Sequence, residues 1–518
     1  MKISELVNNL DIELVGDGNK EIAGITYNSK KVSKNYLFVA LHGSKEEGKN
    51  YIKDAISRGA VAILTDDKTI KYDNAVFIRT DNVSDMFGKV SSRFYGCPSQ
   101  KMKVFTVTGT NGKTTVTYIL EKIFENAGIK LGVVGTIFYR FGELKISAPN
   151  TTPQSSDLHE LFSKMKELGA DGVVMEVSSH GLVQNRISGC DIDVAIFTNL
   201  TQDHLDYHKT MDEYKKAKFL LFEKFLTESE KEKKYSVINI DDSAGRELIK
   251  IAKGTVITYG MKSDATIKAT DIEMLRDKTV FNVIIDGKKI YPIRDEQLPA
   301  SNRVKIETKL IGRHNIYNIL ACIGCAYSQD MDLEKIADGI RKFETVPGRF
   351  ETVNVGQPFS VIIDYAHTPD ALGNLIQAAR YVTIPTAAGG VGKKIITVFG
   401  CGGDRDRSKR SLMGEISGRM SDYTIITSDN PRSEKPELIA LDVEVGLQRI
   451  KCENYEVVLD RTAAVKKAVE LCSPDDILLI AGKGHENYQI IENEKIPYND
   501  KEVAIKILTE KYGKDKNN

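Results

Sequence analysis

Short apolar runs separated by polar, helix-like segments recur along the chain and predict α/β structure. Within residues 1–100 the runs are Leu37 to Ala40 and Val61 to Leu64, and turn residues divide them. Strand-like runs of this length predict a small α/β domain that ends near the Gly-Cys-Pro stretch at residues 96–98.

Longer regular alternation follows in the rest of the chain. From residue 103 to about 345, helical patterns separate the apolar runs Val104 to Thr108, Gly172 to Met175, Val194 to Thr198 and Ser236 to Ile240. From about residue 347 they separate Ser360 to Ile363, Lys394 to Phe399, Tyr423 to Thr427 and Asp476 to Ala481. Such alternation predicts mostly parallel sheets. We therefore expect three α/β domains at residues 1–100, 101–345 and 346–518, the central one P-loop-like and the last Rossmann-like.

Composition excludes some classes of partner. The chain of 518 residues has 72 Lys and Arg against 72 Asp and Glu, so no net charge attracts nucleic acid or anionic lipid. Its seven cysteines are scattered, which is typical of a reducing compartment. Cys322 and Cys325 lie in an apolar helical pattern and are expected to be core residues. The N-terminus lacks a signal-peptide pattern, and no apolar run approaches the ~20 residues of a membrane span. We expect a cytoplasmic protein.

The segment Gly109-Thr-Asn-Gly112-Lys113-Thr114 directly follows a predicted strand and opens a predicted helix. Small residues at such a junction let backbone N–H groups surround a phosphate. Lys113 is then expected to contact the outer phosphates, and the Thr114 hydroxyl to bind Mg²⁺. The usual motif has a glycine at the place of Val107, so this is a shortened variant. The same letters also occur in an ordinary strand-to-helix turn.

Polar residues end two further predicted strands. Glu176 closes the run that begins at Gly172, and Ser178 follows it. Asp203 and His204 come shortly after the run that ends at Thr198. The carboxyl ends of strands in an open α/β sheet converge on the ligand crevice. Carboxylates are ligands for Mg²⁺, so these positions favour a nucleotide and metal site there.

Several long motifs occur in one order along nearly the whole chain. They are G-T-N-G-K-T-T from residue 109, N-T-T-P from 150, M-E-V-S-S-H-G-L from 175, T-N-L-T-Q-D-H-L-D-Y-H from 198, Y-K-K-A-K from 214, G-R-H-N-I-Y-N from 312, P-G-R-F-E from 347, D-Y-A-H-T-P-D from 364 and G-G-D-R-D from 402. In sequence and order they resemble the Mur ligases. The set is most similar to the members that add the third residue of the peptidoglycan stem peptide to UDP-N-acetylmuramoyl-L-Ala-D-Glu.

The resemblance implies an ATP and Mg²⁺ site. Its ATP-binding positions are Gly109, Thr110, Asn111, Gly112, Lys113, Thr114, Thr115, Asn315, Asn318, Asp364 and His367. It implies that Thr114 and Glu176 bind one Mg²⁺, that His204 binds a second, and that Lys218 carries a CO₂-derived carbamate that orients the metal ions. Lys113, Glu176, His204 and Lys218 would be the catalytic residues. From the residues alone, His204 would be a surface histidine and Lys218 a solvated helix lysine.

The resemblance also implies two substrate sites. The UDP-muramoyl dipeptide would contact Thr151, Thr152, Ser178, Gln184 and Arg186, with the uridine diphosphate on the N-terminal domain at Ser29. Asn28 and Lys30 depart from the family pattern around Ser29. The amino acid would contact Arg405, Asp429, Asn430, Pro431, Arg432, Gly482 and Glu486. The Asp-Asn-Pro-Arg form is associated with meso-diaminopimelate, whose distal carboxylate suits the planar guanidinium of Arg432.

The expected function is therefore an ATP-dependent amide ligase that forms an acyl phosphate and closes its domains around small-molecule substrates, as a monomer. The alternatives are the same ligase acting with L-lysine or lanthionine, a folate ligase, or a P-loop switch that hydrolyses ATP without joining anything. The N-terminal domain and the N-T-T-P motif argue against folate as the substrate. An NAD site at residues 400–405 is rejected, because Arg405 stands where the last glycine is needed.

Overall fold

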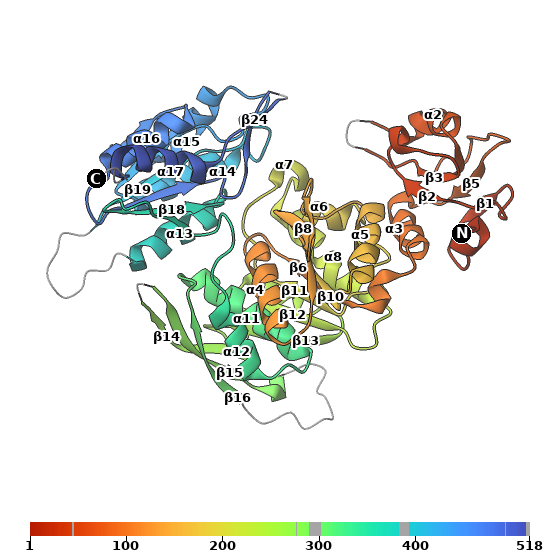
Figure 1. The fold of residues 1–518 in the computed structure, drawn as a ribbon, viewed down its shortest axis with the longest axis horizontal. Helices are drawn as coiled ribbons and strands as arrows, with labels where there is room; N and C mark the ends of the chain where they lie inside the picture. The colour runs from red at the N-terminus through yellow and green to blue at the C-terminus, as the bar shows by residue number, and fades with distance from the viewer. Residues whose placement is uncertain (44–45, 276, 290–301, 383–392, 493, 514–518) are drawn as a thin grey trace.

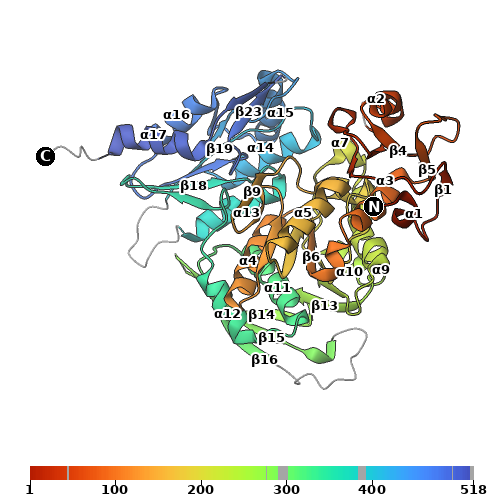
Figure 2. The ribbon, with the colours of Figure 1, turned by 45° about the vertical axis from the view of Figure 1, so that its right-hand side comes forward.

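The structure is a computed structural model that describes residues 1–43, 46–275, 277–289, 302–382, 393–492 and 494–513. These residues form three α/β domains, each with its own main sheet, and the N-terminal and C-terminal domains flank the central one (Figure 1, Figure 2). Strands of the three sheets lie within residues 13–79, 103–308 and 351–481. The predicted α/β class and three-domain arrangement are confirmed.

The N-terminal domain has a five-stranded sheet in the order β1-β5-β4-β3-β2, parallel except for β1. Its strands are β1 (Glu13–Val15), β2 (Gly24–Thr26), β3 (Tyr36–Val39), β4 (Ala60–Thr65) and β5 (Val76–Arg79). Its helices are α1 (Ile3–Leu6), α2 (Ile52–Ser57) and α3 (Val83–Phe94), with short 3₁₀ turns η1 (Ser29–Lys31), η2 (Gly48–Tyr51) and η3 (Pro98–Lys101). The two predicted apolar runs correspond to β3 and β4.

The central domain has an eleven-stranded sheet in the order β16-β15-β14-β13-β12-β11-β6-β10-β7-β8-β9. The strands from β14 to β7 pair in parallel, and antiparallel strands extend both edges. The strands are β6 (Lys103–Thr108), β7 (Leu131–Val134), β8 (Phe138–Phe141), β9 (Leu144–Ser147), β10 (Gly172–Glu176), β11 (Val194–Phe197), β12 (Tyr235–Asn239), β13 (Thr255–Gly260), β14 (Ile267–Met274), β15 (Thr279–Ile285) and β16 (Asn302–Thr308). The four predicted strands are β6, β10, β11 and β12.

Helices cover both faces of this sheet. They are α4 (Lys113–Asn126), α5 (Ser155–Glu167), α6 (Ser179–Val183), α7 (Leu205–His208), α8 (Met211–Leu220), the π-helical turn η4 (Leu221–Phe225), α9 (Leu226–Glu228), α10 (Ser243–Leu248), the 3₁₀ turn η5 (Gly287–Lys289), α11 (Arg313–Ser328) and α12 (Leu333–Lys342). Successive strand residues point to opposite faces, so Phe105 packs with α4 and α11 whereas Val104 packs with α5. The central strands β10 and β11 are buried at every position, and their residues are therefore mostly apolar.

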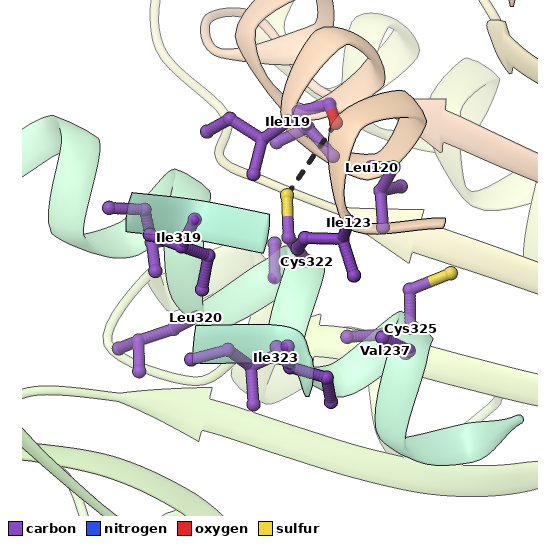
Figure 3. Close-up of a cluster of buried hydrophobic side chains, with 14 of the residues drawn as sticks. Ile119, Leu120, Ile123, Val237, Ile319, Leu320, Cys322, Ile323 and Cys325 are labelled. Atoms are coloured by element: carbon purple, nitrogen blue, oxygen red, sulfur yellow. Dashed lines mark hydrogen bonds between the residues drawn. The ribbon is translucent and has the colours of Figure 1, made fainter. Parts of the chain in front are cut away.

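Cys322 and Cys325 lie on α11 inside this core (Figure 3). Both side chains are fully buried, and the Cys322 thiol donates a 3.5 Å hydrogen bond to the Val116 carbonyl. Burial raises the pKa of both thiols well above its ordinary value. The prediction that they are core residues is confirmed, and all seven cysteines are free thiols.

The C-terminal domain has a six-stranded sheet in the order β17-β18-β22-β19-β20-β21, parallel except for β17. Its strands are β17 (Glu351–Val353), β18 (Ser360–Asp364), β19 (Ile395–Phe399), β20 (Tyr423–Ile426), β21 (Tyr455–Val457) and β22 (Ile477–Ala481), and β23 (Tyr488–Ile491) pairs with β24 (Glu494–Pro497) as a hairpin. Its helices are α13 (Pro369–Val382), α14 (Ser408–Met420), α15 (Pro436–Arg449), α16 (Arg461–Leu471) and α17 (Asp500–Tyr512). The predicted strands are β18, β19, β20 and β22.

Among the described residues, no helix is both long and apolar enough to cross a membrane. Residues 514–518, at the charged C-terminal end of the chain, lie outside the described residues.

Candidate active site

The loop between β6 and α4 has the geometry of a phosphate-binding turn. Gly109 and Gly112 both have positive φ angles, 148° and 90°. A Cβ on Gly112 would lie 2.3 Å from the Asn318 Oδ1, so only glycine fits there. Asn199, which follows the neighbouring strand β11, holds the loop in place, because its Oδ1 accepts a 2.9 Å hydrogen bond from the Asn111 N–H. A rigid glycine turn thus stands at the N-terminus of a 14-residue helix.

Lys113 places a cation over this loop. Its Nζ donates 2.9 Å hydrogen bonds to the carbonyl oxygens of Gly109 and Thr110. Burial lowers the pKa of Lys113, and the carboxylates of Glu176 and Asp203 oppose that shift. The ammonium is therefore positioned to meet a polyphosphate that the loop binds.

Thr114 and Glu176 form the centre of the proposed metal site. The Thr114 hydroxyl donates to the Glu176 Oε2 at 3.0 Å, and the Thr136 N–H donates to the other carboxylate oxygen at 2.9 Å. Glu176 is only 1% exposed. Within the described ranges no three His, Cys, Asp or Glu residues group as a metal site. A hydroxyl and one carboxylate nevertheless fit Mg²⁺, which usually takes its other oxygens from substrate phosphates and water.

The His204 ring lies 5.1 Å from the His180 ring and 6.0 Å from the Tyr214 ring, and the Tyr214 ring also contacts the Lys218 Nζ. His204 has a positive φ of 56°, and its Nε2 is 3.3 Å from the Asp203 Oδ2. Burial lowers the pKa of His204 to about 3, although Asp203 opposes the shift. A neutral imidazole can act as a metal ligand, so the predicted role fits the surroundings.

Lys218 is buried, which corrects the interpretation of the residues alone. Its side chain is 1% exposed, and its Nζ donates a 2.8 Å hydrogen bond to the Gly109 carbonyl. The Nζ also lies 4.3 Å from the centre of the Tyr214 ring. Burial and the nearby Lys113 hold the pKa of Lys218 well below its ordinary value. The helical pattern of α8 did not reveal this, because the phosphate loop that covers Lys218 is more than 100 positions away.

A cavity of about 740 Å³ lies between the central and C-terminal domains next to the phosphate loop. Side chains from both domains line it, including the predicted residues Asn111, Gly112, Thr115, Asn315, Asn318 and Asp364. The Asn111 Nδ2 donates to the Asp370 Oδ2 at 2.8 Å and so joins the two domains at its edge. His367 also reaches the central domain, with its Nε2 3.7 Å from the Asp203 Oδ2. The volume is in the range of cavities that hold small ligands.

The residues predicted for the muramoyl peptide form a connected network next to Glu176. The Thr152 hydroxyl donates to the Glu176 carbonyl at 3.1 Å and accepts from the Ser178 N–H at 3.0 Å. Arg186 donates from Nη1 to the Thr152 carbonyl at 2.7 Å and from Nη2 to the Gln184 Oε1 at 2.8 Å. The Thr151 and Thr136 hydroxyls are 3.2 Å apart.

Ser29 lies apart from this network, on the N-terminal domain. It is 7% exposed and begins the turn η1, where the Asn28 Oδ1 accepts from the Lys30 N–H. The two domains meet nearby, because the Tyr27 hydroxyl donates a 3.1 Å hydrogen bond to the Asp157 Oδ2. A substrate that reached both Ser29 and Arg186 would span this junction.

The residues predicted for the amino acid gather on the C-terminal domain. Arg432 has a positive φ of 53°, and its Nη1 donates to the Gly403 carbonyl at 2.7 Å. Burial lowers the pKa of Arg432, and the neighbouring Arg405 guanidinium lowers it further. The Asn430 Nδ2 donates to the Glu486 Oε2 at 2.9 Å. A pocket with two guanidinium groups and one carboxylate can bind a ligand that carries both negative and positive charges.

Backbone geometry supports the same pocket. Gly482 has a φ of 111°, and a Cβ there would lie 2.7 Å from the Asp429 Oδ2. Pro431, which is also buried, carries the chain from Asn430 to Arg432. The pocket wall is therefore closely packed.

Three residues near these sites had no predicted role. Thr136 follows β7 and holds Glu176, and the rule of polar residues at strand ends could have found it. Arg349 lines the interdomain cavity. Burial lowers the pKa of His314, and the charge of Arg349 lowers it further. Lys483 is fully buried and donates to the Glu486 Oε2 at 2.9 Å. Arg349 belongs to the P-G-R-F-E motif and Lys483 directly follows the predicted residue Gly482, but only the fold shows what these two cations contact.

Comparisons with known proteins agree with this arrangement. Family models match in chain order: Mur ligase family, catalytic domain, over residues 21–95; Mur ligase middle domain over 107–326; and Mur ligase, glutamate ligase domain, over 348–484. A protein of Caldanaerobacter subterraneus subsp. tengcongensis named UDP-N-acetylmuramoyl-L-alanyl-D-glutamate–2,6-diaminopimelate ligase is 41% identical over 510 residues, or 98% of this chain and 99% of the relative. A Bacillus cereus protein of the same name is 40% identical over 511 residues, or 98% and 99% of the two chains.

Solved structures are similar over almost the whole length. One of a ligase with that same name matches with a TM-score of 0.67 and 28% identity, covering 98% of this chain and 99% of the other. MurF ligase from Thermotoga maritima, in complex with ADP, has the same fold, with a TM-score of 0.59 and 18% identity over 96% of this chain and 97% of the other. On these matches and on the geometry of its phosphate loop, the chain belongs to the Mur ligase family.

Proposed function

We propose that the chain is an ATP-dependent ligase that joins meso-2,6-diaminopimelate to UDP-N-acetylmuramoyl-L-alanyl-D-glutamate. Relatives about 40% identical over nearly the full length carry the name of that diaminopimelate ligase. The observation that carries the proposal is the combination of the Thr114–Glu176 centre beside a glycine turn with the Arg432 and Glu486 pocket in one chain.

The phosphate loop serves to activate a carboxylate. A carboxylate oxygen of the dipeptide attacks the γ-phosphorus of ATP, the bond from that phosphorus to the β,γ-bridging oxygen breaks, and ADP leaves. The amine of the diamino acid then attacks the acyl carbon, loses a proton, and expels inorganic phosphate. Lys113 offsets the negative charge that develops on the transferred phosphoryl group. Two Mg²⁺ ions, one held by Thr114 and Glu176 and a second by His204, would supply further charge neutralisation at the phosphates.

Lys218 is proposed to carry a carbamate. Its burial and lowered pKa favour the neutral amine, which is the form that reacts with CO₂. The product replaces a buried neutral amine with a negatively charged group next to Gly109 and near Lys113. Such a group would orient cations at the phosphate loop.

The two substrates are proposed to meet at the phosphate loop from opposite domains. The dipeptide contacts Thr151, Thr152, Ser178, Gln184 and Arg186, with its uridine diphosphate toward Ser29. The diamino acid contacts the C-terminal pocket, where Arg405 and Arg432 bind carboxylate and Glu486 accepts from the distal ammonium. We further propose that the enzyme works as a monomer in the cytoplasm, which agrees with its seven free thiols.

The test is substrate-dependent release of phosphate from ATP. Purified protein is assayed with the UDP-muramoyl dipeptide and, in parallel, with meso-diaminopimelate, L-lysine or lanthionine. Phosphate release that requires both dipeptide and meso-diaminopimelate, with one amide formed per phosphate, supports the proposal. ATP hydrolysis at a rate that does not depend on the added amino acid would instead identify a nucleotide switch. Faster turnover with lysine or lanthionine than with meso-diaminopimelate would overturn the amino-acid assignment.

A further inference from the structure

An ion pair between the central and C-terminal domains lies beside the proposed metal-binding histidine. Asp203 directly precedes His204, and Lys409 belongs to the first turn of α14. The Lys409 Nζ is 3.2 Å from the Asp203 Oδ1, and each side chain is only 7% exposed. His367 adds a second contact from the C-terminal domain. Burial would raise the pKa of Asp203, but Lys409 and His367 hold it well below its ordinary value.

The residues around this pair also cross between the two domains. The Gln202 Nε2 donates to the Asp406 Oδ2 at 3.2 Å and to the Ser408 Oγ at 2.8 Å. Asp406 in turn holds Ser408, whose N–H donates to the Asp406 Oδ1 at 3.0 Å. The segment 406–409 therefore fits against residues 202–203 as one surface.

Contact of this kind depends on how the domains are docked. A buried charge whose partner is removed is strongly unfavourable, whereas two separated charges that regain water are not. Lys409 and Asp203 belong to different domains, so the pair forms only in the docked arrangement. Because the pair is buried, it is sensitive to small changes in the relative position of the two domains.

The pair also connects two of the proposed ligand sites. Arg405, proposed to bind the amino acid, is four positions before Lys409 in the same segment. On the other side, the second oxygen of Asp203 is 3.3 Å from the His204 Nε2, in the proposed metal site. A ligand that orders residues 405–409 will thereby favour one position of the Asp203 carboxylate.

We propose that Lys409 is a positioning residue that couples binding of the amino acid to binding of ATP, by holding Asp203 beside His204 when the domains dock. This inference rests on the proposed function. It predicts that the two ligands tighten each other's binding and that the tightening requires the Lys409–Asp203 pair.

The experiment measures the affinity of β,γ-methylene ATP by calorimetry in the presence of Mg²⁺ and the UDP-muramoyl dipeptide, with and without meso-diaminopimelate. In the natural protein we expect the amino acid to tighten nucleotide binding about tenfold. In Lys409→Met, which keeps most of the side chain but not the charge, the ratio should fall to about one. Lys409→Arg should keep most of the tightening, because it retains the cation.

A matched control and kinetics separate positioning from general damage. Arg419→Met removes a charge from an exposed position of the same helix, 61% exposed, and should leave the coupling unchanged. The kcat of Lys409→Met should fall about 30-fold, whereas its affinity for β,γ-methylene ATP without the amino acid should change less than about threefold, because binding of the nucleotide alone does not need the pair.

The inference is wrong if Lys409→Met keeps the tenfold tightening, if Arg419→Met loses as much, or if the natural protein shows no tightening. Should Lys409→Met fail to fold, Asp203→Asn removes the same ion pair and is judged by the same ratio. The proposed function fails separately, when the natural protein does not turn over dipeptide with meso-diaminopimelate. Turnover in the natural protein with unchanged coupling in Lys409→Met overturns only the role of Lys409.

Discussion

Thr114 donates a 3.0 Å hydrogen bond to the carboxylate of Glu176, a residue 62 positions away in the sequence. The sheet creates this contact, because β10 lies parallel to β6 with Glu176 opposite Val107. The end of one strand thus delivers a carboxylate to the start of the helix that follows the other. Neither side chain needs to move far to share one cation.

Glu176→Gln should weaken the metal site. The amide can still accept from Thr136, but it loses the negative charge that attracts Mg²⁺. We expect the Mg²⁺ concentration that gives half-maximal phosphate release to rise at least about tenfold. Titration of activity with Mg²⁺ measures this directly. Glu160→Gln removes a more exposed carboxylate that pairs with Lys164 and should leave the titration unchanged; an unchanged midpoint in Glu176→Gln would remove that residue from the metal site.

The sequence alone was sufficient for much of the architecture. Central strands such as β6 and β10 are buried on both faces and therefore appear as continuous apolar runs. The glycine turn was visible for a similar reason, since positive φ angles and close approach leave few alternatives to glycine.

The surroundings of individual lysines could not be predicted in this way. Lys218 lies in a charged helical stretch, yet the distant phosphate loop buries it. Lys409 and Lys483 are also buried by partners elsewhere in the chain. Periodicity describes which face of a helix is apolar, but it does not identify which distant segment covers a polar residue. The roles of the substrate-binding residues came from the family resemblance rather than from any local pattern.

Arg432→Ala should change amino-acid selection. The guanidinium is partly buried next to Arg405, so removing it deletes a cation from a site that we propose binds the distal carboxylate. We expect kcat/KM for meso-diaminopimelate to fall about 30-fold or more. L-lysine lacks that carboxylate, and its value should change less than about threefold. Arg449→Ala, at the exposed end of α15, is the control. Equal losses for the two amino acids would contradict this role.

Activity should depend on dissolved CO₂ if Lys218 is carbamylated. Extensive removal of CO₂ from buffer and protein should lower the rate, and added bicarbonate should restore it. With ¹³C-bicarbonate, a carbamate carbon signal should appear in the natural protein and be absent from Lys218→Met. Lys216→Met changes a neighbouring lysine for which no role is proposed, and it should retain the signal. A natural protein that shows no signal and no response to bicarbonate would rule out the carbamate.

His159 should make the central domain sensitive to acid. Its ring is fully buried in α5, its Nε2 lies 3.0 Å from the Ser188 carbonyl, and burial lowers its pKa from 6.5 to about 4. Below pH 6.5 the unfolded chain binds this proton while the folded chain does not, so stability is full above that pH and is lost as the pH falls toward 4. The loss from this group is about 2 kcal/mol at pH 5.

His159→Gln, which keeps a hydrogen-bond donor but does not titrate, should therefore show a smaller fall in the midpoint of thermal unfolding between pH 7.5 and pH 5. The difference should be about 4 to 8 °C, measured by calorimetry on the transition of the central domain. His42 provides the opposite case, because hydrogen bonds with Asp66 and Glu47 raise its pKa and its ring is largely exposed. Protonation of His42 favours the folded state, so His42→Gln cannot reduce the acid-induced loss. A reduction of equal size in both variants would show that burial of His159 is not its cause.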